Sequence, residues 1–381
     1  MNIEDMPLSG KKVLVRVDFN VPIKNGKIID DTRIKKSLKT INYLLEKKAL
    51  VTLCSHLGRP KGKDTRFSLN PIATRLRELG YKVILTLDCI GNSVYKSQIH
   101  QDEKTIILLE NLRFYKEEKE NDFEFAKKLA EPFDLFIQDA FGVCHRNAAS
   151  VSSLPEILPS AMGFLLKEEI KKLSLGLKPK KPFIVIMGGS KISSKLNLIR
   201  KFVEKSNYIL LGGAMIFTFY KAMGLNIGKS LYEEEMINEA KKLLNYQNII
   251  LPDDIIISKE IKENAEIENV DFNKIKENYY GLDIGEKSIL KFKRILSKAE
   301  TVLWNGPMGM FEIKPFDNGT KEIAKMLSES KGKIIVGGGD SVAAINQLNL
   351  KNKFYHISTG GGASLEYLEG KELPGIKALE Y

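Results

Sequence analysis

Cysteine and histidine are scarce in this sequence, with three and four residues respectively in a chain of 381. Cys54, Cys89 and Cys144 lie far apart and form no Cys-x-x-Cys pair. This arrangement excludes a disulfide framework and a cysteine-based zinc site. It favours free thiols in a reducing compartment, so we expect a cytoplasmic protein.

Long hydrophobic runs are also missing. The longest uncharged stretch in the middle of the chain is 206–220, which has 15 residues and includes two glycines. A membrane-spanning helix needs about 20 apolar residues. The first 12 residues contain acidic side chains and no apolar core, so we expect no secretory signal and no membrane partner.

Acidic residues are outnumbered by basic ones, which leaves a net charge of +11. A nucleic-acid binder would concentrate lysine and arginine in runs with interleaved aromatic residues. Here the basic residues are scattered, and the largest cluster is at 178–181. We therefore expect anionic small molecules and no nucleic acid as partners, although surface solvation alone is an alternative explanation of the charge.

The length of the chain suits two domains, at roughly 100–200 residues each. Apolar, β-branched runs alternate with charged helical patterns, which predicts an α/β fold with two Rossmann-like parallel-sheet domains covered by helices. The strands are expected at 11–20, 49–58, 104–113 and 133–142 in the first half, and at 182–189, 207–214, 300–307, 333–340 and 353–362 in the second. Apolar residues at helical spacing in 158–177 predict a helix that joins the two domains.

The expected strands of the first half end in polar side chains. Ligands of open parallel sheets bind beyond the carboxyl ends of the strands, so these side chains are candidate ligand contacts. They include Asp18, Asn20, His56, Arg59 and Arg113. Arg33 and Arg146 lie at nearby loop ends, and arginine matches carboxylate and phosphate with two parallel hydrogen bonds. Each arginine alone would more often be a surface salt bridge, but the grouping indicates an anion pocket. Arg16 lies inside a strand, where a structural role is the alternative.

The expected strands of the second half end in glycines instead. Glycine pairs or triplets stand at 188–189, 212–213, 337–339 and 360–362. Bare backbone at four strand ends favours a large flat ligand such as a nucleotide, because glycine lets the ligand approach closely. Lys191 and Lys195 are four residues apart, and on a helix they would share a face near its N-terminus, where anions are favoured. The alternative for this segment is a tight turn with two surface lysines.

Asp340 directly follows a glycine triplet. A carboxylate beside a phosphate site is a suitable Mg²⁺ ligand, and the alternative is the N-cap of a helix that begins near Val342. The sequence presents no paired nucleophile and base. A nucleotide site with a metal-binding carboxylate, lysines and arginines therefore indicates direct phosphoryl transfer, which depends on positioning and charge neutralisation.

The chain resembles the phosphoglycerate kinase family nearly from end to end. The resemblance is carried by RVDFNVP (16–22), DDTRI (30–34), SHLGRP (55–60), ENLRF (110–114), FGVCHR (141–146), MGGSKISSK (187–195), WNGPMGMFE (304–312), GGGDS (337–341) and STGGGASLEYLEGKELPG (358–375). It implies a Mg²⁺-dependent, hinge-bending monomer. An N-terminal 3-phosphoglycerate domain (1–157) and a C-terminal nucleotide domain (178–357) would face each other across a cleft, have helices on both sheet faces and be joined by the 158–177 helix. Segment 358–381 would return to the first domain.

The resemblance also implies a role for individual residues. The substrate would be bound by Asp18, Asn20, Arg33, His56, Arg59, Arg113 and Arg146. The nucleotide would be bound by Lys195, Gly212, Gly281, Asn305, Pro307, Glu312, Gly338, Gly339, Asp340 and Ser341, with Asp340 on Mg²⁺, Glu312 on the ribose and Gly281 in the adenine pocket. The transferred group would be surrounded by Arg33, Lys191, Lys195, Gly360 and Gly361.

One position departs from the family pattern. Ala148 stands where the family usually has a second histidine, which puts a hinge or substrate-network contact in doubt. The expected reaction is reversible transfer of the acyl phosphate of 1,3-bisphosphoglycerate to Mg·ADP. Two alternatives remain at this level, namely a kinase acting on a different carboxylate and a non-catalytic nucleotide-binding regulator.

Overall fold

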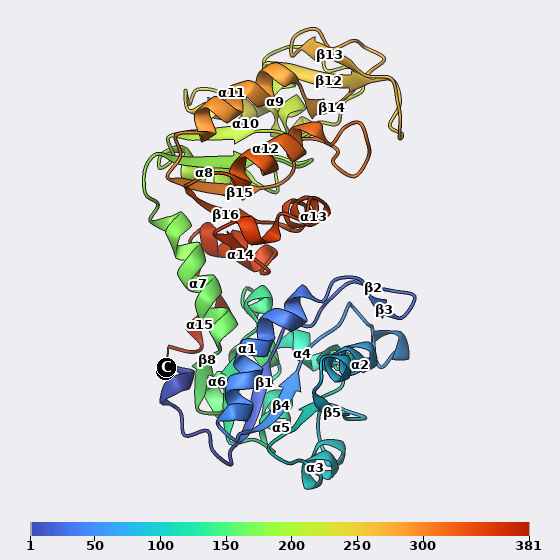
Figure 1. Cartoon of the computed structure of the whole chain (residues 1–381), viewed down its shortest axis with the longest axis vertical. Helices are drawn as coiled ribbons and strands as arrows, with labels where there is room; N and C mark the ends of the chain where they lie inside the picture. The colour runs from blue at the N-terminus through green and yellow to red at the C-terminus, as the bar shows by residue number, and fades with distance from the viewer. Residues whose placement is uncertain (1, 381) are drawn as a thin grey trace. The chain divides into compact units, whose positions relative to one another are not determined.

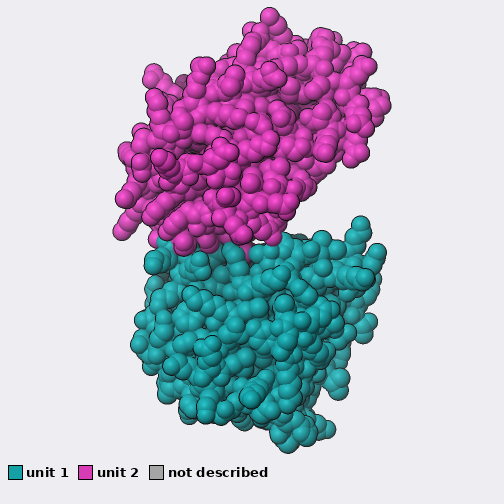
Figure 2. Space-filling view, in the orientation of Figure 1, with its two compact units in different colours: residues 1–171, 371–381 teal, residues 172–370 magenta. Residues whose placement is uncertain are grey.

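The computed structural model describes residues 2–380, and the chain divides into two compact units, which are considered separately below. Unit 1 comprises residues up to Lys171 together with the C-terminal segment from Lys371, and unit 2 comprises Lys172–Gly370 (Figure 2). The chain therefore leaves unit 1 within one helix and returns to it shortly before its end. None of the helices in the described part of the chain is long and apolar enough to cross a membrane.

Unit 1 is built on a six-stranded parallel sheet (Figure 1). The strand order is β5 (Lys82–Leu85), β6 (Thr105–Leu108), β4 (Leu50–Cys54), β1 (Lys12–Arg16), β7 (Leu135–Gln138) and β8 (Ser160–Met162). A hairpin of β2 (Ile23–Lys24) and β3 (Lys27–Ile28) lies outside this sheet. The α-helices are α1 (Thr32–Glu46), α2 (Asn70–Glu78), α3 (Asn92–Ile99), α4 (Glu117–Glu120), α5 (Phe123–Ala130), α6 (Leu154–Ile157) and α15 (Pro374–Lys377), and α7 (Phe164–Leu177) spans the unit boundary.

Side chains alternate between the two faces of the unit 1 sheet, and each face packs against its own hydrophobic core. Val13 and Val15 of β1 point to a core shared with α1 and α2. Leu14, between them, points to a second core that contains Phe125 of α5 and Leu154 of α6. The predicted helices on both faces of a parallel sheet are confirmed.

Unit 2 repeats the architecture with a different sheet order, β11 (Ile249–Ile250), β10 (Tyr208–Leu211), β9 (Phe183–Met187), β15 (Thr301–Asn305), β16 (Lys333–Gly337) and β17 (His356–Ile357). All six strands are parallel. A three-stranded antiparallel sheet adds β13 (Glu268–Asp271), β12 (Asp254–Ser258) and β14 (Tyr280–Ile284). The α-helices are α8 (Leu196–Val203), α9 (Ile216–Ala222), α10 (Ile237–Leu243), α11 (Glu286–Leu296), α12 (Asn318–Ser328), α13 (Gly339–Gln347) and α14 (Gly362–Leu368).

Short 3₁₀ and π segments complete the chain. They are η1 (Ile3–Asp5), η2 (Thr65–Phe67), η3 (Leu112–Phe114), η4 (Phe141–Val143), η5 (Ala149–Ser153), η6 (Glu234–Met236) and η7 (Lys351–Lys353). In unit 1, η3 follows β6 and contains Arg113, and η4 follows β7.

The predicted helix over 158–177 is too long at its start. Residues 160–162 form the edge strand β8, paired in parallel with β7, and the helix begins only at Phe164. Gly163 lies between the two elements, and its backbone packs so closely on Asp139 that an added Cβ would lie 2.2 Å from the carboxylate. Pairing with the neighbouring strand thus overrides the helical pattern of these three residues.

Candidate functional site

Six of the seven polar residues predicted to bind the substrate follow neighbouring strands of the unit 1 sheet, and Arg33 is the exception. β6, β4, β1 and β7 are consecutive in that sheet and parallel, so their carboxyl ends meet at one edge. Asp18 and Asn20 follow β1, His56 and Arg59 follow β4, Arg113 lies in η3 after β6, and Arg146 follows η4 after β7. The fold therefore gathers residues that are up to 128 positions apart in the sequence.

Arg33, in the first turn of α1, reaches back to the loop after β1. Its Nη1 donates to the Asp18 carboxylate at 2.8 Å and to the Asn20 carbonyl oxygen at 3.1 Å. The Asn20 side-chain oxygen in turn accepts the Gly58 N–H at 2.9 Å. These bonds join the loops after β1 and β4 and set the direction of the Arg33 side chain, which stays partly exposed.

His56 is neutral at this edge of the sheet. Its side chain is only 3% exposed, and burial together with Arg16, Arg113, Arg33 and Arg146 holds its pKa well below the usual value. Arg16 Nη2 lies 3.2 Å from His56 Nδ1. Because arginine can only donate, Nδ1 is the acceptor and the ring proton is on Nε2. His56 therefore offers an N–H donor beside several positive charges.

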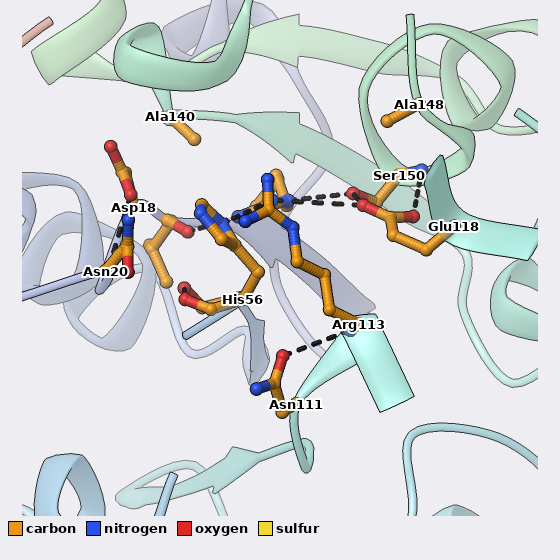
Figure 3. Close-up of polar contacts among 12 residues, drawn as sticks. Asp18, Asn20, His56, Asn111, Arg113, Glu118, Ala140, Ala148 and Ser150 are labelled. Carbon is orange, nitrogen blue, oxygen red and sulfur yellow. Dashed lines mark hydrogen bonds and ion pairs between the residues drawn. The ribbon is translucent and has the colours of Figure 1, made fainter. Parts of the chain in front are cut away.

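Arg113 is held next to His56 in Figure 3. Its backbone N–H donates to Asn111 Oδ1 at 3.0 Å, and its Nη1 donates to the Gly58 carbonyl oxygen at 2.6 Å. Burial, Arg16 and Arg146 lower its pKa to about 10. The guanidinium remains charged at neutral pH, but burial and, after it, the positive neighbours disfavour its charge. A bound polyanion would relieve this repulsion.

Arg16 is structural, in agreement with the alternative drawn from its place inside a strand. It is 1% exposed, and its Nε donates to Ser150 Oγ at 2.8 Å while its Nη1 donates to the Val17 carbonyl oxygen at 2.6 Å. Ser150 Oγ donates to the buried Glu118 carboxylate at 2.6 Å (Figure 3). Burial raises the pKa of Glu118, and the nearby Arg16 opposes that rise. Sequence reasoning missed Glu118 and Asn111, although ENLRF places Asn111 two residues before Arg113.

Ala148 lies apart from this cluster. Its side chain is buried in an apolar group with Ala140, Val143 and Val151. Figure 3 shows it on the side of Ser150, away from Asp18 and Asn20. The departure from the family pattern at this position therefore leaves the contacts of Arg33, His56 and Arg113 intact.

Unit 2 contains a cavity of about 430 Å³ at the glycine-rich strand ends. Of the residues predicted for the nucleotide, Gly281, Pro307, Glu312 and Asp340 line it. The sequence did not single out Phe217, Leu231 and Asp283, which also line it, and it named Gly213 only as part of the glycine pair 212–213. The motif GLDIG contains Asp283 two residues after Gly281, so the signal for this residue was present but not used.

Several glycines near the cavity lie so close to neighbouring residues that a side chain at the glycine position would not fit. An added Cβ on Gly188 would lie 1.9 Å from the Pro307 carbonyl oxygen, and one on Gly281 would lie 2.1 Å from Phe217. Gly212, which is expected to contact the nucleotide, does not line the cavity, and a Cβ there would meet the buried Met308 sulfur at 2.6 Å, so this contact stays a prediction. Gly213, with φ +67°, lines the cavity in its place.

Lys191 and Lys195 do not share a helix face. α8 begins at Leu196, so Lys195 is its N-cap residue and Lys191 lies in the preceding turn. The turn is closed by a bond from Lys195 N–H to the Ile192 carbonyl oxygen at 2.8 Å, and the Glu233 carboxylate accepts the Ser193 N–H at 3.1 Å. The buried side chain of Ile192 fixes this turn against the core, which delays the helix.

Lys195 contacts the end of β15, where its Nζ donates to Asn305 Oδ1. Burial lowers the pKa of Lys195, and the Asp340 carboxylate opposes this effect, so the two groups are electrostatic neighbours. Asn305 Nδ2 is buried and finds no acceptor within the described part of the chain. This amide is a donor suited to a phosphate oxygen.

Asp340 lies in the first turn of α13, whose N-cap is Gly338, so the predicted N-cap role is wrong. Its carboxylate is exposed and lines the cavity together with Ser190. Gly338 and Gly339 do not line the cavity. Ser341 does not either, because its buried hydroxyl accepts the Gly306 N–H at 2.6 Å. Among residues 2–380, no group of three or more potential metal ligands is present, so a metal here would need ligand oxygens besides Asp340.

The last glycine segment precedes α14. Gly360 N–H donates to Ser358 Oγ at 3.1 Å, so this amide is already used within its own turn. Gly361 has φ +52° and is the N-cap residue of α14. The backbone N–H groups of Gly360 and Gly361 were both expected near the transferred group, and the structure shows a hydrogen-bond acceptor for the Gly360 N–H.

Comparisons with known proteins agree along the whole chain. The family model described as phosphoglycerate kinase matches residues 3–371. The phosphoglycerate kinase of Dictyoglomus turgidum is 50% identical over 388 aligned positions, which cover 100% of this chain and 98% of the relative. That of Rubrobacter xylanophilus is 47% identical over 99% of this chain and 97% of the relative. The solved structure of phosphoglycerate kinase from Coxiella burnetii superposes with a TM-score of 0.89 at 36% identity, covering 100% of this chain and 98% of that one.

Proposed function

The chain belongs to the phosphoglycerate kinase family, and from that membership we propose which of its residues perform each part of the reaction. It is a glycolytic kinase that reversibly transfers the acyl phosphate of 1,3-bisphosphoglycerate to ADP, giving 3-phosphoglycerate and ATP. The proposal assigns the phosphoglycerate to unit 1 and the nucleotide, as its Mg²⁺ complex, to unit 2.

In unit 1, the arginine cluster around His56 binds 3-phosphoglycerate. Arg59, Arg113 and Arg146 bind the phosphate and carboxylate groups, because guanidinium groups pair with such anions through parallel hydrogen bonds. His56 Nε2 donates to the same ligand. Asp18 and Asn20 accept or donate hydrogen bonds at the substrate hydroxyl. The support is the gathering of these arginines around His56 at one edge of the sheet, where burial and then the neighbouring positive charges lower the pKa values of His56 and Arg113.

In unit 2, the glycine-lined cavity binds the nucleotide. Gly213 and Gly281 flank the base, and Glu312 accepts from the ribose hydroxyls. The Asn305 amide and Lys195 lie at the phosphate end. Asp340 would hold Mg²⁺, an ion that takes one or two carboxylates together with phosphate oxygens. Asp340 is an exposed carboxylate at the cavity beside the proposed phosphate end, which fits this coordination, and the ion would supply neutralisation of phosphate charge.

The transfer itself needs no covalent intermediate on the protein. Arg33, Lys191 and Lys195, with the backbone at Gly361, would stabilise the charge on the moving phosphoryl group. Lys195 is prepared for this role because burial makes its ammonium group weakly hydrated, so its charge acts strongly on a nearby anion.

The observation that carries the proposal is the separation of two complementary sets, cations around a neutral histidine in unit 1 and bare backbone with carboxylates in unit 2. A coupled assay with 3-phosphoglycerate and ATP, with and without Mg²⁺, tests it. Turnover that needs both substrates and Mg²⁺ is the expected result. Turnover without Mg²⁺, or with a different carboxylate and not 3-phosphoglycerate, would contradict the assignment.

We propose further that the enzyme acts as a cytoplasmic monomer.

A further inference from the structure

Asp283 is a buried carboxylate in the wall of the unit 2 cavity that the proposed reaction does not use. It lies near the end of β14, is 3% exposed and lines the cavity beside Gly309. Burial raises its pKa to about 8, and the nearby Asp317 adds to that rise. The groups that oppose the rise are backbone N–H groups at Gly319, Ile284 and Asn318. A carboxylate kept in so unfavourable a place, within a ligand cavity, calls for a functional explanation.

The Asp283 carboxylate lies between the loop of residues 306–312 and the first turn of helix α12. Asp283 Oδ2 accepts the Gly319 N–H of α12 at 2.7 Å, and Oδ1 accepts the Ile284 N–H at 2.9 Å. An added Cβ on Gly309 would lie 2.2 Å from Asp283 Oδ1, and one on Gly319 would lie 2.4 Å from it. The loop therefore packs directly on the carboxylate, which is itself bonded to the first turn of α12.

The loop in question, residues 306–312, connects the glycine turns of the cavity to Glu312. On one side, Gly189 N–H donates to the Pro307 carbonyl oxygen at 3.1 Å and Gly213 N–H donates to the Met308 carbonyl oxygen at 2.7 Å. On the other side, Met308 N–H donates to Thr320 Oγ1 of α12 at 2.9 Å. Thr320 thus bonds the loop to α12, and Asp283 bonds the first turn of α12 while the loop packs on it at Gly309.

We infer that Asp283 is a positioning residue of the nucleotide site, which holds the 306–312 loop on α12 so that Glu312 meets the ribose hydroxyls. The inference rests on the proposed function, because it takes Glu312 as the ribose contact. It assigns Asp283 no contact with the ligand. Its effect on binding passes through the loop and depends on the ligand having ribose hydroxyls.

Asp283→Asn tests the inference with almost no change of shape. Whichever way the amide is turned, only one of the two backbone N–H groups keeps an acceptor, and the other faces a donor. Leaving one buried donor unpaired costs about tenfold or more in an equilibrium constant. Asp139→Asn is the control for replacing a buried aspartate in unit 1, since Asp139 is equally buried but accepts both Leu165 N–H and Leu166 N–H through Oδ1, a role that an amide oxygen can keep.

Affinities for Mg·ADP, Mg·2′,3′-dideoxy-ADP and 3-phosphoglycerate are measured by calorimetry, with kcat and KM alongside, at pH 9, where Asp283 is ionised and both of its oxygens accept. In Asp283→Asn we expect Mg·ADP to bind about tenfold more weakly and the dideoxy analogue less than about twofold more weakly. The affinity for 3-phosphoglycerate and kcat at saturating nucleotide should stay within about twofold, so the loss appears in KM. Asp139→Asn should leave both nucleotide affinities unchanged.

Equal weakening of ADP and its dideoxy analogue, or equal weakening in Asp139→Asn, would overturn the inference, because either indicates general loosening of the fold. Failure of the proposed ribose contact would show instead in the unaltered protein, as equal affinity for the two nucleotides. If Asp283→Asn does not fold, Thr320→Val removes the second anchor of the same loop. The same selective loss then supports the inference, and full discrimination retained in that variant overturns it.

Discussion

At the scale of single residues, the two units set the charge of their polar groups in different ways. Burial, together with the surrounding arginines, holds the pKa of His56 well below its usual value, so the neutral imidazole acts as a fixed donor through Nε2. Lys195, in contrast, has its charge favoured by Asp340 and disfavoured by burial. Two variants follow from this difference, one for each unit.

Lys195→Ala should lower kcat by about 10²–10³ and weaken nucleotide binding far less. The physical reason is that the partly desolvated ammonium stabilises charge that develops mainly in the transition state. Steady-state kinetics with varied Mg·ATP would measure both parameters. An unchanged kcat with a raised KM would assign Lys195 to ground-state binding and contradict the role proposed here.

Arg113→Ala should act on the other substrate. Loss of a charge-assisted contact of about 1.5–3 kcal/mol predicts a KM for 3-phosphoglycerate that is roughly 10- to 100-fold higher, with the KM for ATP unchanged. Arg75→Ala is the control, because Arg75 is a unit 1 arginine paired with Asp31 and Glu78 at the surface. A shift in the KM for ATP would mean that the ligands of the two units are misassigned.

At the scale of elements, the start of α7 depends on one buried carboxylate. Asp139 follows β7, and its Oδ1 accepts the N–H groups of Leu165 and Leu166 at 2.9 and 3.2 Å. Burial raises the pKa of Asp139 to about 7, while these bonds and the Thr40 hydroxyl oppose the rise. The first turn of α7 is therefore capped by a group that titrates close to neutral pH.

The raised pKa predicts a specific pH dependence of stability. The folded protein keeps the Asp139 proton to a higher pH than the unfolded chain, whose value is 3.8. The stability contributed by this group is complete below pH 4 and is lost as pH rises towards 7, by on the order of 4 kcal/mol at most. Denaturant unfolding from pH 4 to 8 should show this fall, and Asp139→Asn should reduce it. An identical pH profile in the variant would refute the assignment.

At the scale of the whole molecule, the two predicted ligand sets belong to different units. The reacting oxygen and phosphorus must nevertheless come within about 3–3.5 Å of each other. We therefore expect the radius of gyration to fall most when both substrates are bound, and little with either alone. Small-angle scattering on the free protein, on each binary complex and on the ternary complex would measure this. Full compaction by Mg·ATP alone would contradict a closure that needs both ligands.

Local chemistry in the sequence was enough to predict most of the parallel strands and the fold class. Buried parallel strands are continuous apolar runs, and β1, β4, β9 and β15 all lie within the predicted ranges. The short edge strands β8 and β11 and the antiparallel sheet β12–β14 were not predicted, because their pairing depends on neighbours distant in the chain. The same holds for α8, which starts one residue after Lys195 because a turn packed on the core precedes it.

The sequence by itself determined which chemical groups stand at the strand ends, since Arg113, Asp340 and the glycine turns are readable from residue type and position alone. Only the tertiary structure decided which of them meet and in what state. Residues far apart in the chain together produce the neutral form of His56, the burial of Arg16 and the close packing of Asp283 on Gly309 and Gly319. Burial and charge–charge interaction depend on distance in space, and folding sets that distance.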